Sequence, residues 1–183
     1  MNSLERALIN LVDILSANNI PYMIIGGMEN AVWGEPRSTI YIDVTIWLGE
    51  ENTDRIVSIL SVFFHPLVHD PSKFALDMNV FPLESKDGVR VDLIFGRLAY
   101  EKEAIERSVE INIEGSQIGF CTPEDLILHK IISGLSLTND VNHCPDMLIS
   151  CFVNVTSVSQ DKTPVICEYL EKFFTVSFKP VYR

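Results

Sequence analysis

Hydrophobic residues follow two different spacings at the start of the chain, and each spacing predicts a different element. Asn2 and Glu5 stand three residues apart as a capping-box pair, which predicts a helix that continues to about residue 18. Its apolar positions recur at helical spacing: Leu4, Leu8, Leu11, Val12 and Leu15. The short apolar run 22–25 then stops at Gly26 and Gly27, as a buried strand would. We expect a helix, then a strand with two glycines at its carboxyl end.

Strict alternation begins near Thr39 and predicts a second strand. One face carries only apolar side chains: Ile40, Ile42, Val44, Ile46 and Leu48. The other face carries Tyr41, Asp43, Thr45 and Trp47. Because successive side chains of a strand point to opposite faces, Tyr41 and Asp43 share one face.

The middle of the chain alternates between helical and strand patterns. Helical spacing predicts helices over residues 53–64 and 100–107, and apolar runs predict strands over 76–83 and 89–95. Glu114-Gly115-Ser116 separates two short β-type segments, 110–113 and 117–120, and therefore predicts a hairpin. In the strand 89–95, Asp92 lies on the face opposite Val91, Leu93 and Phe95.

The last third of the chain predicts helices. Thr122-Pro123-Glu124-Asp125 combines an N-cap, a proline at the first helical position and acid in the first turn, and it opens a helix through residue 132. Thr163-Pro164 repeats this start before a final helix. We therefore expect an α/β fold in one compact domain, with a core over residues 1–120 and a helical C-terminal part over 121–183 packed on it.

Composition and charge restrict the class of protein. Hydrophobic residues make up 47% and charged residues 21% of the 183 residues, which are ordinary values for a globular domain. There are 14 Lys and Arg against 25 Asp and Glu, and the net charge of −11 disfavours broad attraction to nucleic acid or anionic lipid. No basic segment followed by an apolar one opens the chain, and no stretch is apolar enough to span a membrane. The four cysteines lack C-x-x-C spacing, which indicates reduced residues of the core. We therefore expect a cytoplasmic protein.

Two carboxylates in the middle of strands are the candidate functional residues. Asp43 and Asp92 each stand between apolar neighbours, where a carboxylate is costly to bury unless it is paired or binds a cation. Each has a structural explanation, such as capping a loop or pairing with Arg37. Two of them on separate strands, after a Gly-Gly turn, favour a shared Mg²⁺. The four histidines show no zinc spacing, and neither a phosphate-loop motif nor a G-x-S-x-G elbow is present in the sequence.

Several segments together resemble one protein family. They are Ile24-Ile25-Gly26-Gly27, Gly34, Arg37-Ser38-Thr39, Ile42-Asp43-Val44, Val91-Asp92-Leu93-Ile94 and the segment from Thr122 to Lys130. Their order and spacing over about residues 20–132 resemble the nucleotidyltransferase superfamily, whose fold is shared with the palm of polymerase beta. The bacterial minimal nucleotidyltransferases and the abortive-infection toxins are the branch that they resemble most.

The resemblance implies a fold and a site. The fold would be a small mixed, twisted sheet flanked by helices, with the acids on one side of it and helices covering the other. Asp43 and Asp92 would be the second and third of three metal-binding acids, and Gly26 and Gly27 would contact the phosphates of the nucleotide. The first acid falls at Tyr41, whose phenol is neutral near pH 7 and is a poor ligand for Mg²⁺.

Three further residues take nucleotide-binding roles by the same resemblance. Lys130 would meet the triphosphate, although a lysine on an amphipathic helix often serves only to solvate the outer face. Arg37 would either balance Asp43 or touch a phosphate. Thr39 belongs to the same nucleotide-binding segment.

The function implied is the Mg²⁺-dependent transfer of NMP from an NTP to an acceptor hydroxyl on RNA or protein. The substitution at Tyr41 leaves a second interpretation open. In that interpretation the protein is catalytically silent and binds nucleotide or a protein partner, in a toxin–antitoxin or phage-defence system. A third is an interaction domain that only retains the fold.

Overall fold

A computed structural model of the chain describes residues 1–28, 40–49, 52–126 and 128–129. Its contacts divide the chain into two compact units, Met1–Thr122 and Pro123–Arg183. The helices and strands named below all belong to the first unit. The final helix expected after Thr163-Pro164 lies outside the described residues, and the expectation of a single compact domain stays a prediction.

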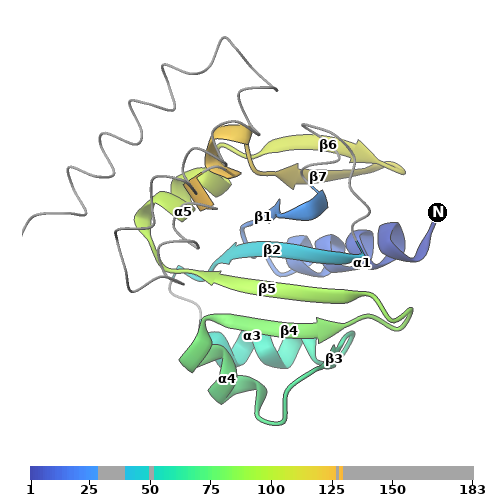
Figure 1. The fold of residues 1–183 in the computed structure, drawn as a ribbon, viewed down its shortest axis with the longest axis vertical. Helices are drawn as coiled ribbons and strands as arrows, with labels where there is room; N and C mark the ends of the chain where they lie inside the picture. Colours follow the sequence, from blue (N-terminus) through green and yellow to red (C-terminus); the bar gives the residue numbers. More distant parts are fainter. Residues whose placement is uncertain (29–39, 50–51, 127, 130–183) are drawn as a thin grey trace, which may run out of the picture. The chain divides into compact units, whose positions relative to one another are not determined.

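A seven-stranded mixed sheet forms the centre of the first unit (Figure 1). Its strands are β1 (Tyr22–Ile25), β2 (Tyr41–Trp47), β3 (His65–Pro66), β4 (Val80–Glu84), β5 (Arg90–Gly96), β6 (Val109–Ile113) and β7 (Ser116–Phe120). They lie in the order β3-β4-β5-β2-β1-β7-β6. The pairs β2–β5 and β1–β7 are parallel and the other pairs are antiparallel. The expected mixed α/β sheet, including the hairpin of β6 and β7, is confirmed.

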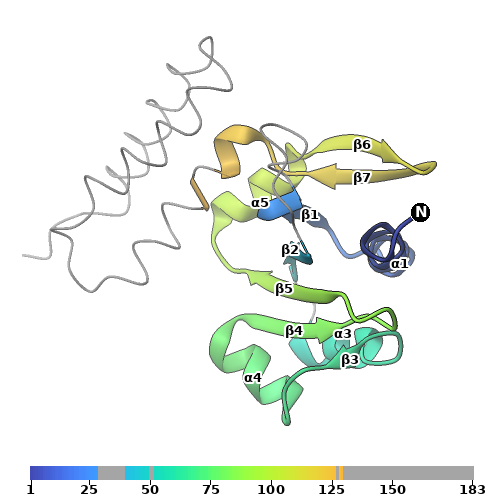
Figure 2. The same cartoon turned by 45° about the vertical axis from the view of Figure 1, so that its right-hand side comes forward.

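Helices flank the sheet on both faces. They are α1 (Ser3–Ala17), α3 (Thr53–Leu60), α4 (Pro71–Met78) and α5 (Ala99–Glu106). Figure 2 shows α1 and α3 on one side of the sheet and α5 on the other. The main apolar core lies on the side of α1 and α3, where the alternating positions Ile42, Val44 and Ile46 of β2 are fully buried. Burial of this surface is the main stabilising contribution to the fold.

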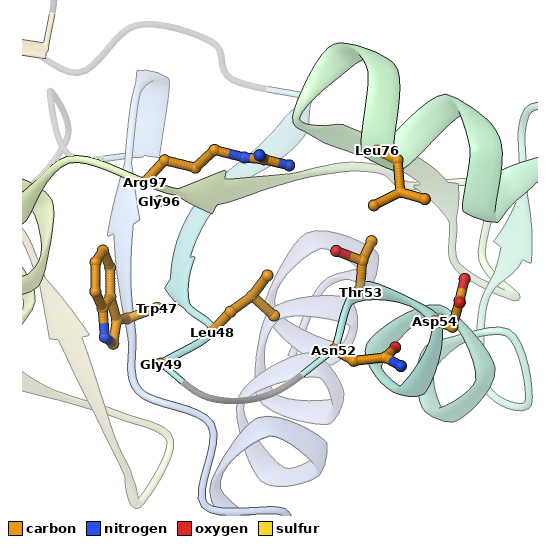
Figure 3. A pocket seen from close by; sticks show the side chains of 9 residues that line it. All are labelled: Trp47, Leu48, Gly49, Asn52, Thr53, Asp54, Leu76, Gly96 and Arg97. Carbon is orange, nitrogen blue, oxygen red and sulfur yellow. The ribbon is translucent and has the colours of Figure 1, made fainter.

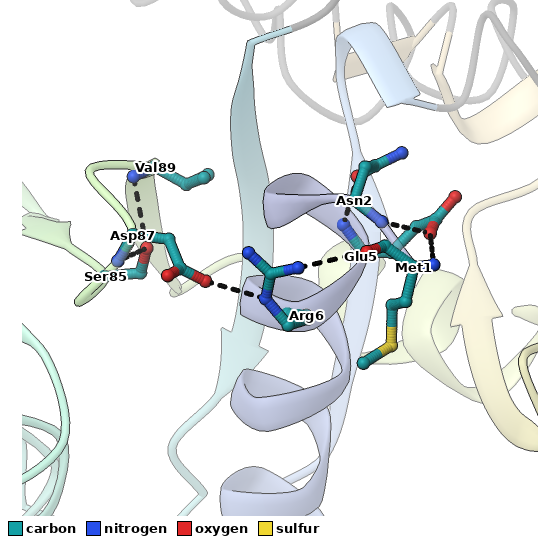
Figure 4. Close-up of polar contacts among 7 residues, drawn as sticks. All are labelled: Met1, Asn2, Glu5, Arg6, Ser85, Asp87 and Val89. Atoms are coloured by element: carbon teal, nitrogen blue, oxygen red, sulfur yellow. Dashed lines mark hydrogen bonds and ion pairs between the residues drawn. The ribbon is translucent and has the colours of Figure 1, made fainter.

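The first helix begins as the sequence predicts. The Asn2 side chain accepts a hydrogen bond of 2.9 Å from the Glu5 amide, and the Glu5 side chain accepts one of 2.8 Å from the Asn2 amide. Arg6, one residue on, donates through Nε to Asp87 at 3.0 Å and so joins the start of α1 to the turn between β4 and β5 (Figure 4). Ser85 accepts hydrogen bonds from two amides of that same turn.

Two expected elements are wrong in part. The helix expected over 53–64 ends at Leu60. The strand expected over 76–83 begins only at Val80, because residues 71–78 form α4. Asp70 caps that helix by accepting from the Lys73 amide at 3.1 Å, and Asn79 ends it in the left-handed conformation. A short capped helix therefore prevails over the strand propensity of its last residues.

Helices cover the face away from the acids, as expected, and α5 lies on the site face in addition. Glu101 of α5 lies beside the site face: a Cβ on Gly96 would be 3.4 Å from Glu101 Cβ and 3.4 Å from Thr45 Cγ2. Thr45 shares a face of β2 with Asp43, and it is fully buried. The site face is thus covered at the α5 end and more open toward Tyr41.

Candidate functional site

Asp43 and Asp92 are paired in register. Strands β2 and β5 run parallel, and within them Asp43 lies directly beside Asp92. Neighbouring strands lie about 4.8 Å apart, and residues in register point to the same face. Both carboxylates are partly buried. The structure therefore brings the two candidate acids together on one face, while their role as metal ligands stays a prediction.

Asp43 lies in an unfavourable environment for a charge. Burial raises the pKa of its carboxyl to about 6, and the negative charge of Asp92 adds to the rise. The Arg90 guanidinium and a hydrogen bond from the Gly27 amide act in the opposite direction. A buried carboxylate next to a second carboxylate is a place where a cation would be stabilised.

The Gly26–Gly27 turn closes over Asp43. Ile25, the last residue of β1, is the register partner of Asp43, and Gly26 follows it with φ +81°. A Cβ on Gly26 would lie 2.9 Å from Cγ of Asp43 and closer still to a carboxylate oxygen. Gly26 is therefore required both for its backbone conformation and for space. The Gly27 amide donates to Asp43, so in this structure the turn holds the carboxylate.

Arg90 is the site residue that the sequence analysis missed. Its Nε lies 3.0 Å from Oδ1 and 3.1 Å from Oδ2 of Asp92. This hydrogen bond and the charge of Asp92 raise the pKa of Arg90. The alternation of the strand could have predicted this pairing, since residues 90 and 92 of one strand share a face. The sequence analysis considered only Arg37 as a partner for the acids, and Arg37 lies outside the described residues.

Tyr41 lies next to Arg90, at the open end of the site. The two are register partners on β2 and β5, and the Tyr41 side chain is 44% exposed. The position where the family resemblance expects an acid therefore presents a phenol beside a guanidinium. At the other end, the hydroxyl of Thr45 is buried and has no hydrogen-bond partner within the described part of the chain.

The residues at the site fit one divalent cation better than two. Mg²⁺ prefers oxygen ligands and is commonly held by one or two carboxylates together with water and substrate phosphates. Asp43 and Asp92 meet that requirement. No group of three or more His, Cys, Asp or Glu that could hold a metal is found in residues 1–28, 40–49, 52–126 and 128–129. By the sequence resemblance, the position of a third acid is the one that Tyr41 occupies.

Three of the expected nucleotide-binding residues cannot be placed beside this pair. Arg37, Thr39 and Lys130 lie outside the described residues. Their roles stay predictions that rest on the sequence resemblance.

A separate pocket lies at the other end of β2 and β5. It has a volume of about 520 Å³, and its lining includes Trp47, Leu48, Asn52, Leu76 and Arg97 (Figure 3). Leu48 and Leu76 approach it from opposite sides. Neither carboxylate of the site lines this pocket. The carboxylate pair is therefore defined by strand register and by the Gly26 turn, and it does not lie in this hollow.

Comparison with known structures identifies the fold as nucleotidyltransferase-like. A nucleotidyltransferase-like protein from Paracoccidioides brasiliensis matches 94% of this chain and 87% of its own, with 15% identity and a TM-score of 0.52. The antibiotic-resistance factor ANT(2'')-Ia matches 94% of this chain and 96% of its own, with 16% identity and a TM-score of 0.54. The lincosamide antibiotic adenylyltransferase LnuA, bound to lincomycin, matches 87% of this chain and 100% of its own, with 13% identity and a TM-score of 0.51.

These similarities concern the fold alone, since the identities are low. No protein-family model matches the chain, and no curated protein matches its sequence. In the described residues, no helix is both long and apolar enough to cross a membrane.

Proposed function

We propose that this protein is a Mg²⁺-dependent nucleotidyltransferase that transfers NMP from an NTP to an acceptor hydroxyl. In this reaction the acceptor oxygen forms a bond to the α-phosphorus and its hydroxyl proton is released to solvent. The bond from that phosphorus to the oxygen of the β-phosphate breaks, and pyrophosphate leaves. The observation that carries the proposal is the register pairing of Asp43 with Asp92 beside the Gly26 turn. The shared fold with adenylyltransferases supports it.

Different residues of the chain would bind the cation, contact the phosphates and position the carboxylates. Asp43 and Asp92 would hold the cation, and Gly27 orients Asp43 through its amide. A bound Mg²⁺ would offset the negative charge that develops on the phosphate oxygens. Arg37, Thr39 and Lys130 would contact the phosphates of the nucleotide, as the sequence resemblance implies. Gly26 lets the backbone approach closely, because any side chain there would collide with Asp43.

The acceptor is proposed only as a hydroxyl group. The sequence resemblance points to RNA or protein, whereas two structural neighbours have antibiotics in their names or bound. With a net charge of −11, general attraction to a nucleic-acid backbone is weak, so an RNA acceptor would need specific contacts. A cytoplasmic location is part of the same proposal.

One observation favours a second function. Tyr41 and Arg90 occupy the part of the site where a further acid would be needed for a second metal ion. A site of this kind could bind nucleotide without transferring it, and the protein would then act through a partner in a toxin–antitoxin or phage-defence system. In this alternative the carboxylate pair still binds Mg²⁺ and nucleotide.

Transfer of label from NTP separates the two functions. The protein is incubated with NTP labelled at the α-phosphate, Mg²⁺, and candidate RNA, protein or small-molecule acceptors. The proposed enzyme transfers label to an acceptor, and Asp92→Asn abolishes the transfer. Release of pyrophosphate with the label recovered as free NMP, and none on an acceptor, would indicate hydrolysis instead. Binding of NTP with neither transfer nor pyrophosphate would support the silent alternative.

A further inference from the structure

Arg90 holds the same oxygens that a cation would need. Its Nε contacts both carboxylate oxygens of Asp92, at 3.0 and 3.1 Å. The contact follows from the strand, because residues 90 and 92 of β5 project from the same face two positions apart. A charged hydrogen bond to both oxygens reduces their capacity to accept another ligand.

Asp43 is not neutralised in the same way. It accepts a hydrogen bond from the Gly27 amide, and among the described residues it forms no ion pair with a cationic side chain. The ion pair of Arg90 therefore balances Asp92, while no cationic side chain within the described ranges pairs directly with Asp43.

The Arg90 guanidinium also has a second possible ion-pair partner. The Arg90 side chain is 58% exposed, whereas that of Asp92 is 20% exposed. The register partner of Arg90 on β4 is Glu84, so a carboxylate on the neighbouring strand faces the same side of the sheet. A guanidinium released from Asp92 can pair with Glu84 without unfolding any part of the strand.

We propose that Arg90 is a built-in competitor for the divalent cation, which must displace the guanidinium from Asp92 in order to bridge Asp43 and Asp92. The inference rests on the proposed function, because it assumes that the carboxylate pair is a cation site. Its consequence is a lowered apparent affinity for the cation: only molecules with the ion pair open are competent to bind. The site would stay largely free of cation until the local Mg²⁺ concentration or a bound nucleotide favours the open form.

Titration with Mn²⁺, followed by the electron paramagnetic resonance signal of the free ion, tests the proposal. The variants are Arg90→Gln, Asp92→Asn, Asp43→Asn and the double variant Arg90→Gln/Asp43→Asn. Arg97→Gln is the matched control, since it removes the same charge from the end of β5 but does not touch the acid pair. Circular dichroism and thermal unfolding establish that each variant is folded.

The expected result is that Arg90→Gln binds Mn²⁺ about two- to five-fold more tightly than the unmodified protein, the range set by a partly exposed ion pair. Arg97→Gln leaves the affinity unchanged, and the double variant loses the gain. A second outcome is that Arg90→Gln binds Mn²⁺ no more tightly than Arg97→Gln while Asp92→Asn loses binding. In that case the proposal that Arg90 competes with the cation is wrong, and Asp92 is still supported as a cation ligand. If Asp43→Asn and Asp92→Asn both bind like the unmodified protein, the cation site itself is wrong, and the proposed function is lost with it.

Discussion

Gly26 and Asp43 lie so close together that the glycine has no room for a side chain: a Cβ at position 26 would be 2.9 Å from Cγ of Asp43. The residues come from different strands, since Gly26 follows β1 and Asp43 lies in β2. The contact links the glycine turn to the acid that has the raised pKa. Both stability and binding should therefore depend on this pair.

Gly26→Ala should destabilise the protein for two reasons, the positive φ of +81° and the collision with Asp43. We expect the free energy of unfolding to fall by about 2–4 kcal/mol, measured by urea denaturation. Gly88→Ala is the matched control, because Gly88 also has a positive φ of +74° but nothing lies within 4 Å of its Cβ position. It should cost only about 1 kcal/mol. Equal losses for the two variants would show that the contact with Asp43 contributes nothing.

Asp43→Asn should stabilise the protein at neutral and alkaline pH. The pKa of Asp43 is raised from 3.8 to about 6 in the folded state, so between these values the native state binds more protons than the unfolded state. Stability contributed by this group is therefore present below about pH 4 and is lost as pH rises through 6, by at most about 3 kcal/mol and by less where solvent screens the charge.

The measurement is the difference in the free energy of unfolding between Asp43→Asn and the unmodified protein, at several pH values from 4 to 8. Taking the difference cancels the titration of the acids that do not interact with Asp43. The variant should be the more stable form at pH 8, and its advantage should shrink steadily as the pH is lowered to 4. An advantage that is the same at every pH would contradict the raised pKa.

Tyr41→Asp should strengthen Mg²⁺-dependent nucleotide binding. The new carboxylate would stand two residues from Asp43 on the same face of β2, and beside Arg90. We expect the Kd for the Mg²⁺ complex of the preferred NTP to fall about fivefold, the scale of one added charge interaction at a partly exposed site. Calorimetry measures the change, and Tyr41→Phe is the control because it leaves the charge as it was. If both variants bind alike, the loss of the acid is not what limits the site.

Alternation along single strands was sufficient to predict much of the site. The pattern of β2 and of β5 placed Asp43 and Asp92 on polar faces, and the structure shows the two faces to be one. The capping pair Asn2 and Glu5 likewise predicted the start of α1. These features depend on residues close together in the chain, where the periodicity of a single element decides the outcome.

Features that depend on distant residues could not be predicted in this way. The pairing of Arg90 with Asp92 needed only alternation, but the position of Arg90 beside Tyr41 depends on the register of two strands that are far apart in the sequence. The burial of Thr45 depends on where α5 packs. Helix α4 was missed because Leu76 and Met78 suit a strand, although Asp70-Pro71 is a clear helix start.

Thermal unfolding with each of the four NTPs, in the presence and absence of Mg²⁺, tests the central claim most directly. A ligand that binds only the native state raises the Tm. If Asp43 and Asp92 form a cation and nucleotide site, at least one NTP raises the Tm of the unmodified protein with Mg²⁺, and the rise is lost without Mg²⁺ and in Asp92→Asn. If no NTP changes the Tm, or if the rise persists in Asp92→Asn, the carboxylate pair is not a nucleotide site.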